Sequence, residues 1–213
     1  MNDLTIRTLA LGSHQANACL LYREGRTDAL LIDPGDDLDV LEQALTVAQR
    51  TLTDILLTHG HFDHILAAAP LARKYGARVH VHPLDAHMLL TPGDALYNPA
   101  WCHLPFEPLR ADAPFPTEEG SWPLEVCGVS FEGFHTPGHT PGSVCLLDRE
   151  HGALFTGDTI FAYGYGRTDF PGGNDDAMRA SILRLLGMDR SLTVYSGHGE
   201  ADSLDAIARR WGR

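Results

Sequence analysis

Short apolar runs, each bounded by Gly, Pro or Asp, recur along the chain and alternate with amphipathic stretches. Such runs are typical of β-strands buried in a core. The strands predicted in this way are Cys19–Tyr22, Ala29–Ile32, Ile55–Leu57, Val79–Val81, Val144–Leu147, Ala153–Thr156 and Thr193–Tyr195. Helices are predicted where apolar residues recur with helical spacing. They are Leu38–Arg50, Ile65–Tyr75, Asp176–Leu186 and a last helix from about Ser203 to Trp211.

The alternation of strands and helices predicts a layered α/β fold, although the order of elements does not by itself separate a Rossmann sheet from a sandwich. No repeat, low-complexity tract or Gly/Ser linker interrupts the pattern, so we expect residues 1–213 to form a single domain. One stretch does not fit the alternation. Thr91–Ser121 is rich in Pro and carries aromatic residues without periodicity, and we expect a long loop there that could cover a site.

Charge and composition narrow the expected partners. The chain carries 28 acidic residues against 16 basic ones, a formal net charge of -12, which repels a phosphate backbone and disfavours nucleic-acid binding. No segment reaches the roughly 20 apolar residues needed to cross a bilayer, and no signal peptide is recognisable, so we expect a cytoplasmic protein that does not bind membranes. The four scattered cysteines lack a Cys-x-x-Cys pair, and we expect them to be buried and free.

The strongest chemical signal is the stretch Leu56-Leu57-Thr58-His59-Gly60-His61-Phe62-Asp63-His64. An apolar strand runs there directly into three imidazoles and a carboxylate, which core packing does not require. Alternate residues of an extended loop point the same way, so His59 and His61 can share one ion, and the chain then turns into a helix that carries Asp63 and His64. Neutral imidazole and carboxylate are ligands for divalent zinc, iron and manganese. The stretch therefore predicts metal binding.

Further ligands are needed, because each ion takes three or more protein ligands besides an open position for water. Three later residues qualify, since each follows an apolar run and is flanked by Gly, which lets the backbone approach an ion closely. They are His139 in Thr136-Pro137-Gly138-His139-Thr140-Pro141-Gly142-Ser143, Asp158 in Thr156-Gly157-Asp158, and His198 in Ser196-Gly197-His198-Gly199.

These residues, in this order and with Asp33-Pro34-Gly35 after an early strand, resemble the metallo-β-lactamase superfamily and, within it, the short glyoxalase II-like hydrolases. The resemblance spans nearly the whole chain and implies a four-layer αββα sandwich with two metal ions at one edge of its sheets. It also implies the ligands, which are His59, His61 and His139 for one ion, Asp63, His64 and His198 for the other, and Asp158 as a bridge. Zinc is the metal expected first, with iron or manganese as alternatives, and Asp63 and Asp158 are the expected catalytic carboxylates.

Two more residues gain an expected role from the resemblance. Asp33 would orient a ligating imidazole from behind, although a strand-ending Asp-Pro-Gly is also an ordinary turn signal. Arg167, within the Gly-rich segment Tyr163–Gly173, matches a basic residue close to the metals in glyoxalase II-like proteins and persulfide dioxygenases. Its guanidinium could bind a substrate carboxylate through two parallel hydrogen bonds, or simply pair with Asp169.

The reaction implied by the resemblance is hydrolysis of a thioester, S-lactoylglutathione or a related acyl-thiol, by a hydroxide that two metal ions generate from a shared water. Residues 199–213 are too few for the helical C-terminal domain that contacts glutathione in longer relatives, so we expect none. The alternatives are a mononuclear-iron persulfide dioxygenase, a lactonase or other ester hydrolase of this fold, and a metal-binding domain without catalysis. True β-lactamases commonly place Cys where this chain has Asp158, which disfavours lactam hydrolysis.

Overall fold

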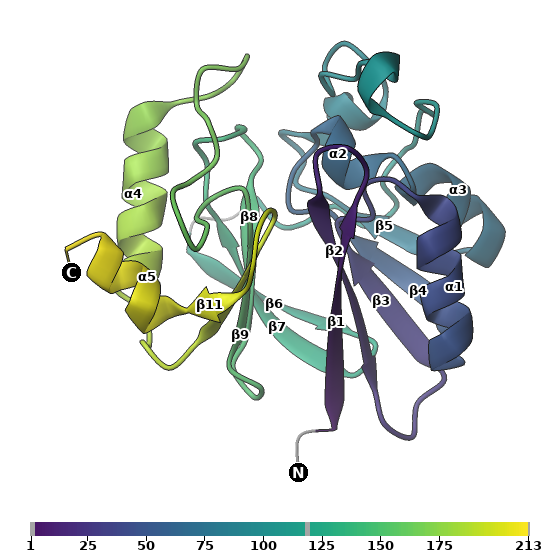
Figure 1. Ribbon diagram of the computed structural model, residues 1–213, viewed down its shortest axis with the longest axis horizontal. Coiled ribbons are helices and arrows are strands. Elements are labelled where there is room, and N and C mark those ends of the chain that lie inside the picture. Colours follow the sequence, from purple (N-terminus) through teal and green to yellow (C-terminus); the bar gives the residue numbers. More distant parts are fainter. Residues whose placement is uncertain (1–2, 118–119, 213) are drawn as a thin grey trace.

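The computed structural model describes residues 3–117 and 120–212, and two β-sheets lie face to face at its centre (Figure 1). The N-terminal half forms the first sheet and its helices. Its elements are β1 (Leu4–Leu11), β2 (Ala16–Arg23), β3 (Asp28–Ile32), α1 (Leu38–Ala48), β4 (Thr51–Leu56), α2 (Phe62–Ile65), α3 (Ala68–Tyr75) and β5 (Arg78–His80). Strands β1, β2 and β3 pair antiparallel, whereas β4 is parallel to both β3 and β5.

The C-terminal half forms the second sheet. Two short 3-10 helices, η1 (Ala86–Leu89) and η2 (Pro99–Trp101), lie in the connection that leads to it. Its elements are β6 (Ser121–Val126), β7 (Val129–His135), β8 (Val144–Asp148), β9 (Ala153–Gly157), α4 (Asp175–Leu186), β10 (Thr193–Ser196), β11 (Asp202–Ser203) and α5 (Leu204–Arg210). The strand order is β11-β10-β9-β8-β7-β6, and all neighbours are antiparallel except β9 and β10, which α4 connects.

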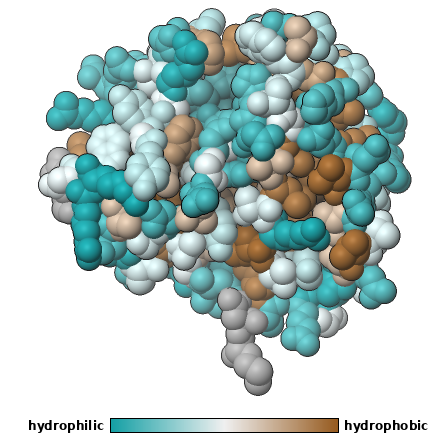
Figure 2. Space-filling model, in the orientation of Figure 1, coloured by the Kyte–Doolittle hydropathy of each residue, from teal (hydrophilic) through white to brown (hydrophobic). Residues whose placement is uncertain are grey.

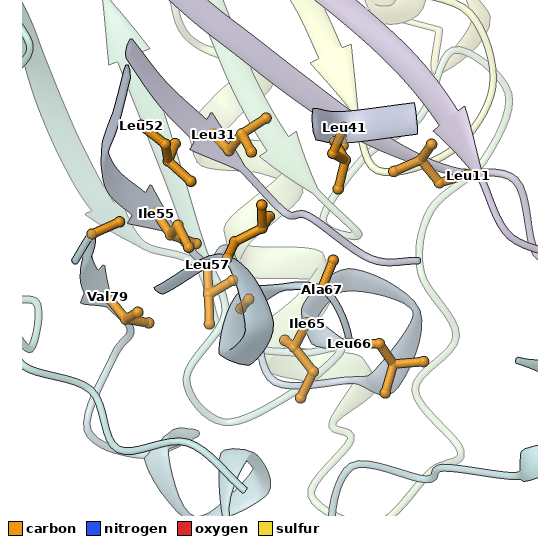
Figure 3. Packing of buried hydrophobic residues seen from close by; sticks show 14 of the residues in the cluster. Leu11, Leu31, Leu41, Leu52, Ile55, Leu57, Ile65, Leu66, Ala67 and Val79 are labelled. Carbon is orange, nitrogen blue, oxygen red and sulfur yellow. The ribbon is translucent and has the colours of Figure 1, made fainter. Parts of the chain in front are cut away.

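Helices α1 and α3 cover the outer face of the first sheet, and α4 and α5 cover that of the second (Figure 1). Many strands are therefore buried on both faces, which explains why they read as continuous apolar runs in the sequence. In β3, Leu30 packs between the two sheets while Leu31 belongs to the outer cluster with Leu41 of α1, part of which Figure 3 shows. In β8, Leu146 points between the sheets and Leu147 toward α4 and α5. The predicted αββα sandwich is confirmed.

Four strands have no counterpart among the predicted elements, and one of them, β11, is only two residues long. β1 and β6 lie at the edges of their sheets and β7 alternates buried with exposed residues, so none of them carries a continuous apolar run. The single helix predicted over Ile65–Tyr75 is wrong, because the chain forms two helices, α2 and α3, that are separated at Leu66–Ala67. The loop predicted over Thr91–Ser121 contains η2 and ends where β6 begins at Ser121, while its positions 118–119 lie outside the described residues.

The surface of the molecule is largely hydrophilic on the face that Figure 2 shows. Figure 2 shows that hydrophilic residues cover most of one face, with hydrophobic ones gathered mainly over the half in which Figure 1 places β1 and α1. Two of the exposed apolar side chains, Val40 and Val47, belong to α1. Within residues 3–117 and 120–212, no helix combines the length and the apolar character that crossing a bilayer would require.

Candidate metal centre

Loops that follow strands of both sheets meet at one edge of the sandwich, the edge at which Figure 1 places α2. The loop after β4 is joined to the second sheet by the Val144 N–H, which donates to the Thr58 carbonyl (2.9 Å). The loop after β10 is joined to the first sheet by the Asn17 N–H, which donates to the Gly197 carbonyl (2.7 Å). Residues from distant parts of the chain are thus held at the same place.

The first of two clusters of polar side chains consists of His59, His61 and His139. Their ligand atoms lie within 4.8 Å of one another, and the His61 Nδ1 is 2.7 Å from the His139 Nε2. All three side chains are buried. Burial and the neighbouring imidazoles lower the pKa of His61 to about 3 and hold the pKa of His59 well below its ordinary value. At neutral pH these two rings are therefore uncharged and carry a free lone pair.

The second cluster consists of Asp63, His64 and His198, and it is charged. The Asp63 Oδ2 lies 3.4 Å from the His198 Nε2 and 3.7 Å from the His64 Nε2. Burial alone would lower the pKa of His64, but Asp63, Asp158 and Asp33 outweigh it and raise that pKa to about 10. Burial would raise the pKa of Asp63, but His64 and His198 hold it well below its ordinary value. Asp63 is therefore a carboxylate at neutral pH.

Asp158 lies between the two clusters. Its Oδ2 is 3.5 Å from the His139 Nε2 of the first cluster and 3.6 Å from the His198 Nε2 of the second. Its Oδ1 is 3.4 Å from the His64 Nε2. The structure thus brings all the predicted ligands together, in the two groups and with the shared carboxylate that the resemblance implies.

Asp33 fixes imidazoles of both clusters from behind. Its side chain is buried and accepts hydrogen bonds from the Thr58 N–H (2.7 Å), the Thr58 hydroxyl (2.6 Å) and the His64 Nδ1 (3.1 Å). Because that hydroxyl donates to Asp33, it can accept from the His59 Nδ1 at 3.1 Å. The Nδ1 atoms of both rings are thus engaged and their Nε2 atoms are turned toward the clusters, so the His59 Nε2 is free of a proton and the His64 Nε2 becomes free once that ring loses its proton. The backbone of Asp33 is left-handed (φ 51°), so the turn interpretation also holds.

Two backbone carbonyls orient two other imidazoles through their Nδ1 atoms. The His139 Nδ1 lies 2.7 Å from the Arg167 carbonyl, and the His198 Nδ1 lies 3.2 Å from the His14 carbonyl. A carbonyl only accepts, so each Nδ1 carries the proton and each Nε2 presents a lone pair. Sequence reasoning assigned Arg167 a role through its side chain but did not foresee this use of its backbone.

Unpaired buried atoms show that the clusters suit a cation. Among the described residues, the His59 Nε2, the His64 Nε2 and the Asp158 Oδ1 are buried and have no hydrogen-bond partner. Leaving a buried polar atom unpaired costs about 1–3 kcal/mol. A divalent cation would satisfy such atoms, since imidazole nitrogen and carboxylate oxygen are its usual ligands.

A cavity of about 480 Å³ opens onto the clusters. Apart from ligands, its walls are mainly aromatic and apolar, and they include His14, Phe62, Leu96, Trp101, Phe161 and Phe170. Leu96 and Trp101 belong to the segment predicted to cover a site. Arg167 also lines the cavity, over the Phe170 ring (4.0 Å), and it pairs with Asp169 through two hydrogen bonds of 2.6 and 2.5 Å. That pair is more than half exposed, so it is weakly held against a competing anion.

Sequence reasoning missed Asn17, which holds the loop of His198. The Asn17 side chain is buried, and its Nδ2 donates to the carbonyls of Ser196 (2.9 Å) and Gly199 (2.7 Å). Its carbonyl partners lie about 180 positions away in the chain. A single polar residue at the start of an apolar strand gave no local signal of that partnership.

Comparisons with known proteins agree with this geometry. The family model described as "Metallo-beta-lactamase superfamily" matches residues 12–198. The chain is 31% identical over 209 residues to the hydroxyacylglutathione hydrolase GloC of Haemophilus influenzae, covering 92% of this chain and 91% of the relative. It is 34% identical over 200 residues to the probable metallo-hydrolase YqgX of Bacillus subtilis, covering 93% and 92%.

Solved structures extend the likeness to the fold. TTHA1623 in a di-iron-bound form is 37% identical, with a TM-score of 0.82 over 95% of this chain and 97% of that one. A structure described as the BLEG-1 B3 metallo-beta-lactamase is 33% identical, with a TM-score of 0.83 over 95% of both chains. ETHE1 from Myxococcus xanthus is 27% identical, with a TM-score of 0.77 over 96% of this chain and 82% of that one.

Proposed function

The chain belongs to the metallo-beta-lactamase superfamily, and from that premise we propose that it is a two-metal hydrolase that cleaves thioesters, with S-lactoylglutathione or a related acyl-thiol as substrate. The observation that carries the proposal is the pair of ligand clusters on either side of Asp158, at the wall of a largely apolar cavity. The thioester is favoured because GloC, which matches over nearly the whole chain, is named a hydroxyacylglutathione hydrolase.

In the proposed enzyme His59, His61 and His139 would hold one ion, Asp63, His64 and His198 the other, and Asp158 would reach both. Bound divalent ions would supply Lewis acidity, which polarises a carbonyl and lowers the pKa of a water toward neutrality. Structural zinc sites usually close their shell with cysteines. An all-His/Asp set that borders a cavity supports catalysis over a purely structural role. Zinc remains the metal proposed first, and the di-iron form of TTHA1623 makes iron the next candidate.

The other residues of the site would position the reactants. The apolar and aromatic cavity walls would exclude bulk water from the thioester. Asp33 and the carbonyls of Arg167 and His14 would keep the imidazoles in the tautomers that the clusters need. The Arg167 guanidinium, on the cavity wall, would donate to a carboxylate of the acyl-thiol in competition with Asp169. A thiolate leaves readily, so the site needs no strong general acid.

The proposal is tested by assaying metal-loaded protein with S-lactoylglutathione and comparing it with Asp158→Asn. We expect hydrolysis by the parent chain and a fall of at least about 100-fold in kcat for the variant, because even residues behind the ligands cost 10- to 100-fold. Circular dichroism and thermal unfolding check that the variant stays folded. Fully metallated protein that hydrolyses no acyl-thiol would overturn the thioesterase proposal, and an active Asp158→Asn variant would overturn the role of Asp158.

The structural likeness to ETHE1 keeps one other reaction in view, the oxidation of a persulfide at a single iron. The first cluster with Asp158 offers enough ligands for one ion. Iron content near one per chain, with oxygen uptake on glutathione persulfide and no thioester hydrolysis, would favour that reaction. A β-lactam belongs among the test substrates as well, because one similar structure is described as a B3 metallo-beta-lactamase.

A further inference from the structure

Asp85, between β5 and η1, is a completely buried carboxylate with three hydrogen-bond donors around it. Its Oδ1 accepts from the Gly142 N–H (2.7 Å), and its Oδ2 accepts from the Thr140 hydroxyl (2.6 Å) and the Gly60 N–H (3.1 Å). It belongs to neither ligand cluster and does not line the cavity. The proposed chemistry therefore gives no reason for burying this charge.

The three donors come from the two loops that carry the first cluster. Gly60 lies between His59 and His61 in the loop after β4 of the first sheet. Thr140 directly follows His139 in the loop after β7 of the second sheet. One carboxylate thus ties together the loops whose imidazoles, from two different sheets, must converge on the same ion.

Each of the two loops has a glycine where it meets the turn that carries Asp85. A Cβ on Gly142 would lie 2.5 Å from the Asp85 Oδ1, and a Cβ on Gly60 would lie 2.6 Å from the Cβ of Met88 in η1. Real Cβ atoms do not approach other atoms so closely. The turn that carries Asp85 and Met88 is therefore pressed directly against the backbone of each loop.

The hydroxyls of Thr140 and Ser143 are also arranged to suit a carboxylate at position 85, which accepts hydrogen bonds but does not donate them. The Ser143 Oγ accepts from the Thr140 N–H (3.2 Å) and lies 2.7 Å from the Thr140 Oγ1. With its oxygen engaged by Ser143, the Thr140 hydroxyl directs its hydrogen to Asp85. Every partner of Asp85 is a donor, which a carboxylate can satisfy and an amide cannot, because one of its two terminal atoms is itself a donor.

We propose that Asp85 is a positioning residue of the first cluster, which sets His59 and His61 at the distance from His139 that binding of one ion requires. The inference rests on the proposed metal centre, but not on which substrate is cleaved. Removing the carboxylate would let the two loops separate while leaving Asp63, His64 and His198 in place. The expected consequence is a selective loss of affinity for one of the two ions.

The experiment measures zinc affinity by chelator competition, with full-length Asp85→Asn beside the parent chain. We expect one of the two ions to bind about 10- to 100-fold more weakly, the range typical of residues that orient ligands, and the other to bind unchanged. Asp148→Asn is the matched control. Asp148 is equally buried and accepts from the N–H and the Nδ1 of His151, at the opposite end of β8 from the site. It should lose stability without a change in either zinc affinity.

A second pair of variants tests the proposal if Asp85→Asn does not fold. Thr140→Ser keeps the donor to Asp85 and should bind zinc as the parent chain does, whereas Thr140→Val should weaken the same ion as Asp85→Asn. Unchanged affinities in Asp85→Asn and Thr140→Val, or a loss shared with Asp148→Asn, would overturn the proposal. A parent chain that binds no zinc would instead overturn the metal centre itself, so the two failures are distinguishable.

Discussion

The two ligand clusters shift the pKa of a buried histidine in opposite directions. His61 and His64 are three positions apart, and both are buried, yet the pKa of His61 is lowered to about 3 while that of His64 is raised to about 10. Burial acts in the same direction on both rings. The difference comes from the neighbours. For His61 the imidazole of His139 outweighs the carboxylate of Asp63, whereas for His64 the carboxylates Asp63, Asp158 and Asp33 prevail.

This contrast bears on how each cluster would take up a metal ion. An imidazole binds a metal through a free lone pair, so a protonated ring must first lose its proton. In the first cluster His59 and His61 already carry free lone pairs at neutral pH, and Asp85 accepts hydrogen bonds from both of its loops. The second cluster must release a proton, but it offers the negative charge of Asp63. The two ions should therefore differ in their pH dependence and respond to different substitutions.

The largest expected effect is the loss of a whole ion. His61→Ala should remove the ion of the first cluster and His64→Ala that of the second. Each cluster has only three ligands of its own besides the shared Asp158, and each variant removes one of them. Elemental analysis should then find about one ion per chain in each variant, against two in the parent. A ratio of two in both variants, or of zero in both, would contradict the picture of two separate clusters. Thermal unfolding of each variant controls for misfolding.

The next effect is on the pH dependence of binding. Below about pH 10 the second cluster must displace at least the proton of His64, so its affinity should rise at least about tenfold for each pH unit between pH 6 and 8. The affinity of the first cluster should vary much less over that range, because His59 and His61 are already neutral. Chelator competition at several pH values measures both slopes.

Asp33→Asn sharpens that test, because the hydrogen bond and charge of Asp33 help to raise the pKa of His64. The steep part of the pH dependence should move to lower pH in this variant. In metal-free protein, the raised pKa of His64 contributes stability that is fully present below its ordinary value of 6.5 and is lost as pH rises through about 10. Equal slopes for both ions, or a steep range that Asp33→Asn does not move to lower pH, would contradict the assigned charges.

The smallest expected effect concerns Arg167, whose side chain touches neither cluster. Arg167→Ala keeps the backbone carbonyl that holds His139 but removes the guanidinium from the cavity wall. KM for an anionic acyl-thiol should therefore rise severalfold, while kcat and the metal content stay close to those of the parent. Asp169→Ala is the informative partner, since freeing the guanidinium should lower KM. A fall in kcat with unchanged KM would assign Arg167 to the chemistry instead.

The ligands could be predicted because each stands in a local pattern, such as the alternation of His59 and His61 after an apolar strand. The residues that hold those ligands could not. Asp85 meets Gly60 and Gly142 at separations of 25 and 57 positions, and nothing beside it in the chain indicates which donors surround it. Local pattern also limited the prediction of the fold. The strands that are buried on both faces were predicted, but the edge strand β1 was not, because one of its faces is largely exposed.

The most direct test of the account is a crystal structure of metal-loaded protein with anomalous diffraction measured at the metal absorption edge. We predict two peaks on either side of Asp158. One should lie about 2.0–2.2 Å from nitrogens of His59, His61 and His139, and the other at similar distances from Asp63, His64 and His198. A single peak at one cluster, or none in protein that is active on a thioester, would contradict the two-metal centre.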